Sequence, residues 1–157
     1  MKASGETRDL VDALLSASRA FVAVADRSLS AYEGDVTLSQ YRALVILSAR
    51  GPQRVGDLAA ALAVSQPNAT RMCLRLSGKG LVRRSRSTAD RRTVRVSVTD
   101  EGRHVVSEVG VARRAELARI VKEMDIAGTD HVIQALRAFT SAAGEVPEDG
   151  WALGWGQ

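Results

Sequence analysis

Apolar residues recur at a spacing of three and four over most of the chain, and they alternate strictly with polar residues in one short stretch. The first spacing is typical of amphipathic helices and the second of half-buried strands. The pattern predicts helices over residues 10–29, 37–50, 55–63, 65–80, 99–124 and 129–143, and strands over residues 81–86 and 93–98. The expected fold class is therefore mainly α with a small antiparallel β-wing.

Short polar residues and glycines mark the ends of these helices. Thr37 and Gln40 form the T-x-x-Q pattern of a capping box, whereas the third helix has no comparable cap. Ser65 and Thr99 are placed to cap the fourth and fifth helices. Gly80 ends the fourth helix, because glycine accepts the left-handed conformation that such ends require.

The helix over residues 65–80 has two different faces. The face expected to turn inward carries residues at i, i+3, i+4 and i+7, namely Ala69, Met72, Cys73 and Leu76. The other face carries Gln66, Asn68, Thr70, Arg71 and Arg75. Amide side chains suit adenine edges, guanidinium groups suit guanine, and the free amides behind Ser65 suit a phosphate oxygen. We expect a DNA-reading helix, with a merely solvated helix face as the alternative.

Positive charge is concentrated in the middle of the chain. Residues 51–99 contain ten Lys and Arg against two acids, a balance of +8, whereas the whole chain carries +4. A local excess of this kind indicates an anionic partner for one part of the molecule. An acidic hairpin would instead have favoured a protein-binding module.

The polar link between the two predicted strands should form a projecting hairpin tip. Asp90 is close enough to orient Arg92, and Arg91 can face a phosphate. Arginine suits a narrow minor groove because the potential there is strongly negative. We include Arg86, Asp90, Arg91 and Arg92 among the predicted DNA contacts. The alternative is a local ion pair that stiffens the turn.

Three motifs occur in order along this segment. V-S-Q-P begins at Val64, G-L-V-R-R begins at Gly80, and D-R-R at Asp90 leads through an alternating strand to T-D-E-G at Thr99. Together they resemble the MarR family of bacterial transcription regulators, closely over residues 36–102 and loosely over residues 10–143. The resemblance implies a winged helix-turn-helix domain with N- and C-terminal dimerisation helices. It also implies that the helix over residues 65–80 reads DNA and that Arg92 enters the minor groove.

The first, fifth and sixth helices carry apolar stripes that one small winged domain cannot cover, so we expect a homodimer. The expected organisation is an N-terminal dimerisation helix (10–34), a winged helix-turn-helix DNA-binding lobe (36–99), C-terminal dimerisation helices (100–144) and a tail of unassigned order (145–157). The expected function is that of a ligand-responsive repressor that binds a palindromic operator in double-stranded DNA.

The resemblance further implies a small phenolic or lipophilic effector, bound between the dimerisation helices and the DNA-binding lobe. The lining residues suggested by position are Phe21, Tyr32, Tyr41, Arg42 and Val45. Aromatic and apolar residues at helical spacing are also typical of a core, which is the alternative for this set.

The remaining reactive residues indicate neither a cofactor nor a metal site. Cys73 is the single cysteine, which excludes an intramolecular disulfide and a multi-cysteine metal site. A nucleophilic role in an enzyme would need an exposed thiol beside a histidine, and helical spacing instead turns this sulfur inward. No apolar run approaches the roughly 18 residues of a membrane span. The chain is therefore expected to be a cytoplasmic protein without a membrane partner.

Overall fold

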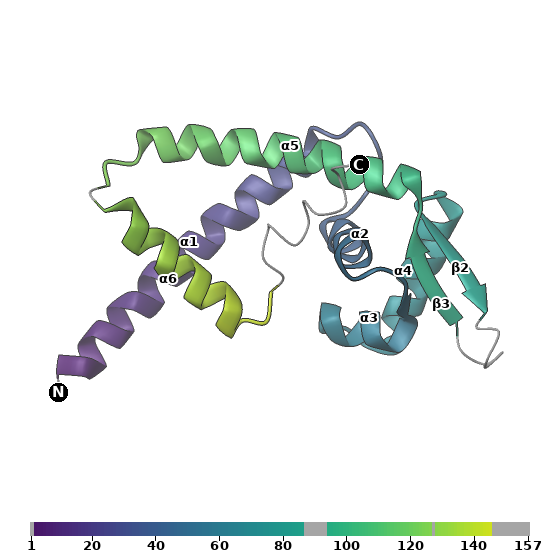
Figure 1. Cartoon of the computed structure of the whole chain (residues 1–157), viewed down its shortest axis with the longest axis horizontal. Helices are drawn as coiled ribbons and strands as arrows, with labels where there is room; N and C mark the ends of the chain where they lie inside the picture. The colour runs from purple at the N-terminus through teal and green to yellow at the C-terminus, as the bar shows by residue number, and fades with distance from the viewer. Residues whose placement is uncertain (1, 87–93, 127, 146–157) are drawn as a thin grey trace.

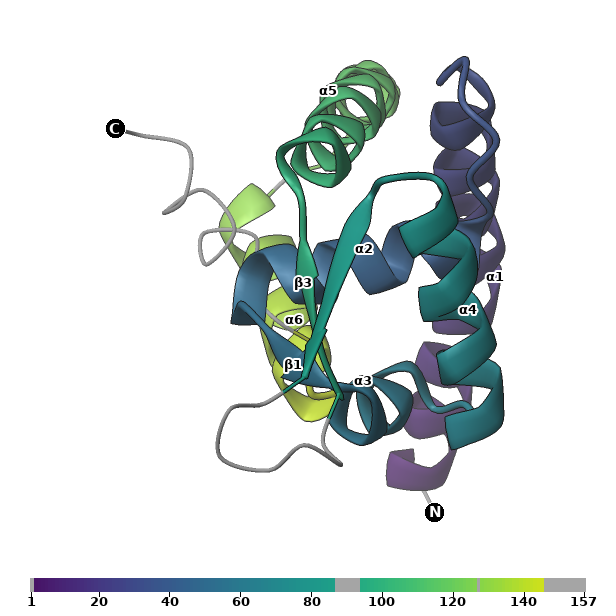
Figure 2. The same cartoon turned by 90° about the vertical axis from the view of Figure 1, so that its right-hand side faces the viewer.

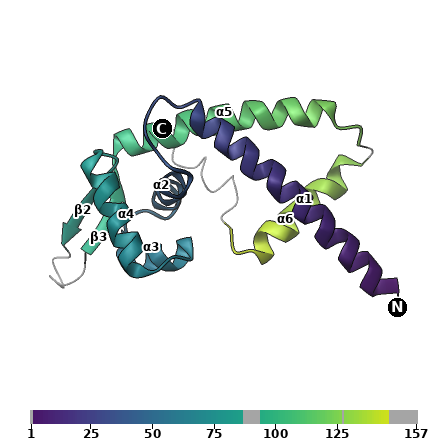
Figure 3. The same ribbon diagram turned by 180° about the vertical axis from the view of Figure 1, so that it is seen from behind.

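The computed structural model describes residues 2–86, 94–126 and 128–145 (Figure 1). The elements in chain order are α1 (Lys2–Ser30), α2 (Leu38–Arg50), β1 (Gln53–Arg54), α3 (Val55–Leu62), α4 (Gln66–Gly78), β2 (Val82–Arg86), β3 (Val94–Val98), α5 (Asp100–Glu123) and α6 (Thr129–Ala142). The short helices and the strands gather at one end of the molecule, and α6 and the start of α1 lie at the other (Figures 1 and 3). The expected fold class, mainly helical with a small antiparallel sheet, is confirmed.

Two of the predicted helix caps are present as hydrogen bonds. The Gln40 amide donates to Thr37 Oγ1 at 3.3 Å, and the Thr37 amide donates to Gln40 Oε1 at 3.1 Å, which completes the capping box. Thr99 Oγ1 accepts from the Gly102 amide at 3.1 Å and so caps α5. These bonds satisfy amides that the first turn of a helix leaves without a partner.

Two predicted boundaries were wrong. The first helix begins at Lys2, and not at Leu10, because residues 2–9 have no apolar spacing that would reveal a helix and include weak helix formers such as Gly5 and Thr7. The fourth helix ends at Gly78, two residues before the predicted Gly80. Gly80 nevertheless has the left-handed backbone predicted for it, with φ of 73°.

The sheet has three antiparallel strands in the order β1-β3-β2. Val82 of β2 pairs with Val98 of β3, and Val96 is completely buried, which confirms the inward side of the predicted alternation. The strand β1 was not predicted because its two residues are too few to show a period. It is held by pairing with β3 alone.

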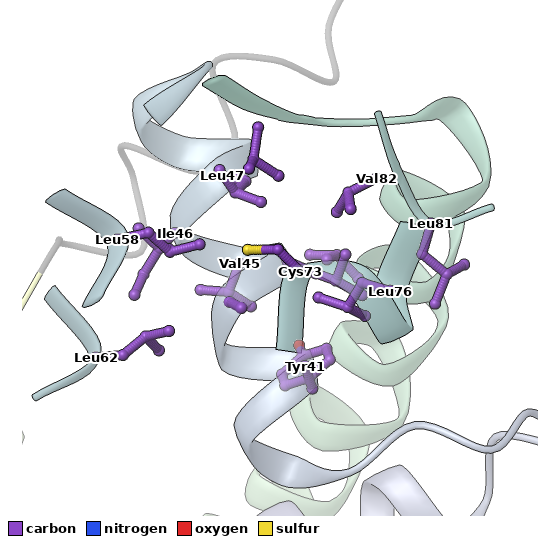
Figure 4. Close-up of a cluster of buried hydrophobic side chains, with 14 of the residues drawn as sticks. Tyr41, Val45, Ile46, Leu47, Leu58, Leu62, Cys73, Leu76, Leu81 and Val82 are labelled. Carbon is purple, nitrogen blue, oxygen red and sulfur yellow. The ribbon is translucent and has the colours of Figure 1, made fainter. Parts of the chain in front are cut away.

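One hydrophobic core fills the lobe between α2, α3, α4, the sheet and the first half of α5. Side chains from five elements meet there without any exposure, among them Leu44, Leu58, Leu76, Val96 and Val105. The close-up in Figure 4 shows Leu58 of α3, Cys73 and Leu76 of α4 and Val82 of β2 directed into the same interior. This core fixes α4 relative to the sheet.

The long helices are much less buried. The second half of α5 and the length of α6 expose large apolar side chains, including Val121, Met124, Ile133, Leu136 and Phe139. No residue of α6 is buried in the single chain, so the apolar stripe predicted for the sixth helix is left uncovered within one copy. Among the described residues, no helix is long and apolar enough to cross a membrane.

Candidate nucleic-acid interface

The outward side of α4 brings together three of the residues predicted to read DNA, namely Asn68, Arg71 and Arg75, and all three are exposed. Gln66 is also exposed, but in the first turn of the helix and on the stripe that continues into Ala69 and Cys73. The opposite side of the helix contributes three completely buried residues to the core, Ala69, Cys73 and Leu76. The predicted separation is confirmed for these residues, whereas Met72, predicted to face inward, and Thr70, predicted to face outward, are both half-buried.

Three of the side chains predicted to read DNA already have partners within α4. Arg71 Nη2 donates to Asn68 Oδ1 one turn earlier. Thr70 is half-buried, and its hydroxyl donates to the carbonyl oxygen of Gln66 at 2.9 Å. Because a guanidinium has five N–H donors, Arg71 can keep this bond and still donate to a base edge. Thr70 is less available, since its hydroxyl hydrogen is used by its own helix.

The first turn of α4 is suited to a phosphate oxygen. Ser65 occupies the N-cap position, but its hydroxyl makes no capping hydrogen bond. Pro67 lies in this turn and has no amide to satisfy. The other first-turn amides and the positive end of the helix dipole are therefore not neutralised by a side-chain cap. An anion at this end would take the place of that cap.

The strand β2 places two arginines on the side of the sheet that faces α4. Arg84 pairs with Val96 and Arg86 with Val94, and both valines pack toward the core. Burial raises the pKa of the Cys73 thiol on α4, and the positive charge of Arg84 partly opposes this rise. The basic side of the wing is therefore next to α4. The predicted tip residues Asp90, Arg91 and Arg92 lie outside the described residues.

The end of α4 is fastened to the start of α5. Thr99 Oγ1 donates to the carbonyl oxygen of Gly80 at 2.7 Å, and the Thr99 amide donates to that of Leu81 at 3.1 Å. A Cβ atom at Gly102 would lie 2.2 Å from the Leu81 carbonyl oxygen. Glycine is needed for this approach, which gives the T-D-E-G motif a structural role. The contact fixes the direction in which α4 presents its exposed face.

Two ion pairs that the sequence did not predict hold the lobe to other segments. Lys79 Nζ, just after α4, lies 3.0 Å from Asp35 Oδ2 in the loop before α2. Arg42 Nη2 of α2 lies 2.7 Å from Glu145 Oε1 beyond α6. The partners are 44 and 103 residues apart in the sequence. Periodicity carries no signal for such contacts, which arise only when the chain has folded.

The residues suggested for an effector pocket have different surroundings. Tyr41 and Val45 lie in the core and are 6% exposed, whereas Phe21 is 44% exposed on α1. Tyr32 is half-buried, and its pKa is raised by burial and by the nearby Glu101 and Glu108. Arg42 is exposed and paired as described above. A hollow of about 360 Å³ beside α1 is lined by other residues, namely Ser18, Arg19, Val22, Ala23, Asp26 and Leu38.

Groups suited to enzyme chemistry do not cluster in the part of the chain that the structure describes. No three His, Cys, Asp or Glu side chains within it are positioned to hold a metal ion. Cys73 is free and completely buried. A buried thiol with a raised pKa is poorly suited to act as a nucleophile, because the thiolate is the reactive form.

Comparison with known proteins gives the same family for this arrangement. Residues 36–94 match the model of the MarR family. The transcriptional repressor MdtR of Bacillus subtilis is 37% identical over 84 residues, which is 54% of each chain. The matched segment spans about half the length of the curated relatives.

Solved structures extend the likeness to nearly the whole chain. The crystal structure of RV1404 from Mycobacterium tuberculosis is 40% identical, with a TM-score of 0.81, and the match covers 88% of this chain and 95% of that one. YusO from Bacillus subtilis is 29% identical, with a TM-score of 0.62, over 87% of this chain and 96% of that one. The sequence motifs, the winged-helix lobe and these relatives agree, and the chain belongs to the MarR family of transcription regulators, which are not enzymes.

Proposed function

We propose that this protein binds double-stranded DNA as a homodimer and represses transcription from a palindromic operator. The observation that carries the proposal is the outward face of α4, where Asn68, Arg71 and Arg75 are exposed beside a basic wing, with Gln66 exposed in the first turn. An α-helix fits the major groove of B-DNA, in which each base pair presents a different pattern of donors and acceptors.

Each group of the interface has a proposed role. The amides of Gln66 and Asn68 pair with adenine edges, and Arg71 and Arg75 donate to guanine. The first turn behind Ser65 takes a phosphate oxygen. Arg86 contacts the backbone, and the tip residues Asp90, Arg91 and Arg92 serve the neighbouring minor groove, with Arg92 inserted and Asp90 orienting it.

The exposed apolar side chains of α1, α5 and α6 support the homodimer. The largest of them are Leu10, Leu15, Phe21, Val121, Ile133, Leu136 and Phe139, each at least 41% exposed in the single chain. Monomeric proteins rarely leave so large an apolar area in water, and a second copy of the same helices would cover it. Two recognition helices would then meet half-sites roughly 34 to 36 Å apart.

The repressor and effector roles rest on different support. The relative MdtR is named a repressor, and we assign the same direction of control to this chain. We assign a small phenolic or lipophilic effector to the region where α1 meets the lobe, near Phe21 and Tyr32. Binding there would change the separation of the two recognition helices, which needs a free energy of about 1 to 3 kcal/mol.

The test is a selection of bound sequences from random duplex DNA by the purified protein, repeated at two salt concentrations. We expect a consensus with two-fold symmetry, and binding that weakens as salt rises because phosphate contacts release counterions. An Arg71→Ala variant should lose base preference at one position of each half-site. Failure of the wild-type protein to enrich any sequence at low salt would overturn the proposal.

A further inference from the structure

The sheet has a second basic surface that faces away from the core, which we name the outer face. The register places five side chains there. Arg54 of β1 lies opposite Arg95 of β3, Ser85 of β2 lies opposite the same Arg95, and Arg83 lies opposite Ser97. Directly opposite residues project from the same side of a sheet, with Cβ atoms about 5 Å apart. Three arginines therefore project from one small surface, and none of them belongs to the predicted reading face.

These arginines have no acidic partner in the part of the chain that the structure describes. All three are exposed, and no salt bridge joins them to an acid in residues 2–86, 94–126 or 128–145. Like charges directly opposite each other destabilise a sheet pair. The arrangement of Arg54 against Arg95 costs stability in the free protein, and an anionic partner would remove that cost.

The outer face continues into a hollow at the end of the sheet next to α5. This hollow has a volume of about 280 Å³, and its lining includes Arg83, Ser97 and Arg103. Asp100 and Glu101 also line it, and Asp100 is paired with Arg103. The positive surface therefore extends from the hairpin end of the sheet and stops at these acids.

The position of the outer face in the molecule favours DNA as the anion. Figure 2, in which the sheet end of the molecule faces the reader, shows β2 and β3 lying in front of α2. The sheet lies at the end of the molecule opposite to α6 and the start of α1, the helices of the proposed dimer (Figures 1 and 3). In a dimer joined through those helices, the two sheets lie far from the two-fold axis. Duplex that lies near them belongs to the flanks of the operator.

We infer that Arg54, Arg83 and Arg95 bind phosphates of the DNA that flanks the operator. Arg95 is one residue from the end of β3 that meets the hairpin, and Arg54 is paired with it, so these two lie nearest the duplex. Arg83 lies further along the sheet, opposite Ser97, and would meet the duplex after these two. The inference rests on the proposed DNA binding. These contacts would make the affinity depend on the length of the duplex, and they would add no base preference.

The test compares two duplexes that carry the consensus from the selection experiment. One contains only the consensus, and the other adds about ten base pairs of arbitrary sequence at each end, or one helical turn. Dissociation constants are measured by fluorescence anisotropy over a series of salt concentrations. The wild-type protein should bind the longer duplex more tightly, with a steeper salt dependence by about one unit for each added phosphate contact.

Two variants distinguish the loss of the arginine charges from a disturbance of the sheet. The triple variant R54Q/R83Q/R95Q should bind the short duplex like the wild type and gain nothing from the flanks. The matched variant R54K/R83K/R95K keeps the charge and should keep the gain. Circular dichroism checks that both are folded.

The outcomes distinguish this inference from the function on which it rests. No binding by the wild type to either duplex would overturn both. Equal wild-type affinity for the two lengths would overturn the flanking contact alone. If the glutamine variant keeps the full gain, the outer face serves another anionic partner, such as an acidic protein surface, and the DNA assignment is wrong.

Discussion

The winged lobe and the long helices differ in how completely one chain covers their apolar residues. In the lobe, Leu44, Leu58, Leu76 and Val96 have no exposure at all. In α6, by contrast, no residue is buried and Phe139 is 50% exposed. The lobe can therefore hold its shape within one copy, whereas the helices that flank it need another surface. The free energy that stabilises the fold of the winged lobe is thus separate from the free energy that would join two copies of the chain.

Truncation of a buried side chain in the lobe should lower the stability of the protein more than any other change proposed below. Leu58 is completely buried, and Leu58→Ala should lower the free energy of unfolding by about 2 to 5 kcal/mol, because it removes buried methyl groups and leaves a cavity. Urea unfolding followed by circular dichroism measures the loss. The matched control is Leu74→Ala, since Leu74 is 50% exposed on α4 and the same truncation there should change stability little. Equal losses for the two variants would contradict the closed core.

A charge on α6 should act on assembly and leave the lobe intact. Phe139→Asp places a carboxylate on the proposed dimer surface, where burying it would be costly. We expect the dissociation constant of the dimer to rise by at least about tenfold, which corresponds to about 1.4 kcal/mol. Analytical ultracentrifugation over a range of concentrations measures it, with Phe139→Leu as the apolar control. A dimer of undiminished stability would show that α6 is not part of the interface.

The contact between the end of α4 and the start of α5 should matter less for stability than the buried core, and a second glycine on α5 provides an internal control. Gly102→Ala would bring a methyl group against the Leu81 carbonyl oxygen and Val98, and it should cost about 1 to 3 kcal/mol. Gly110→Ala meets nothing within 4 Å and should stabilise α5 by about 0.5 to 1 kcal/mol, because alanine favours the helix. Thermal unfolding of both variants provides the measurement. A shift of the same sign for both would contradict the close approach at Gly102.

Local patterns in the sequence were sufficient for most of the lobe. The caps at Thr37 and Thr99 were predictable because each depends on residues three positions apart, and the faces of α4 follow from its period. The start of α1 was missed because its first turns have no apolar stripe. Apolar periodicity marks the residues of a helix that are buried, so a stretch of helix that buries no residues shows no such pattern in the sequence.

The candidate site was predictable only where one element forms it. The exposed side of α4 comes from a single helix, so its residues could be named in advance. The outer face combines Arg54, Arg83 and Arg95 from three strands, one of which is two residues long. Its existence depends on the register between strands, which the sequence does not specify for so short a strand. Pairs such as Lys79 with Asp35 are hidden for the same reason, since only the folded chain brings them together.

The smallest predicted effect concerns Glu116 of α5, which pairs with Arg27 of α1 and with Arg119 of its own helix. Glu116 Oε2 lies 3.2 Å from Arg119 Nε, and its Oε1 lies 2.9 Å from Arg27 Nη2. Hydrogen bonds from Arg119, and then from Arg27, lower the pKa of the Glu116 carboxyl. A lowered pKa means that the folded state favours the charged form, so the stabilisation is present at neutral pH. It is lost as the pH falls below the ordinary glutamate value of about 4.3 and through the lowered pKa.

Glu116→Gln should therefore be slightly less stable than the wild type at pH 7, and the difference should vanish in acid. Unfolding midpoints of both proteins between pH 7 and pH 3 test this, with the double variant R27Q/E116Q completing a cycle that isolates the contact between α1 and α5. Exposed pairs contribute little, so the cycle needs low salt, where screening is weakest. A difference that stays constant with pH would mean that packing of the side chain, and not its charge, joins the two helices.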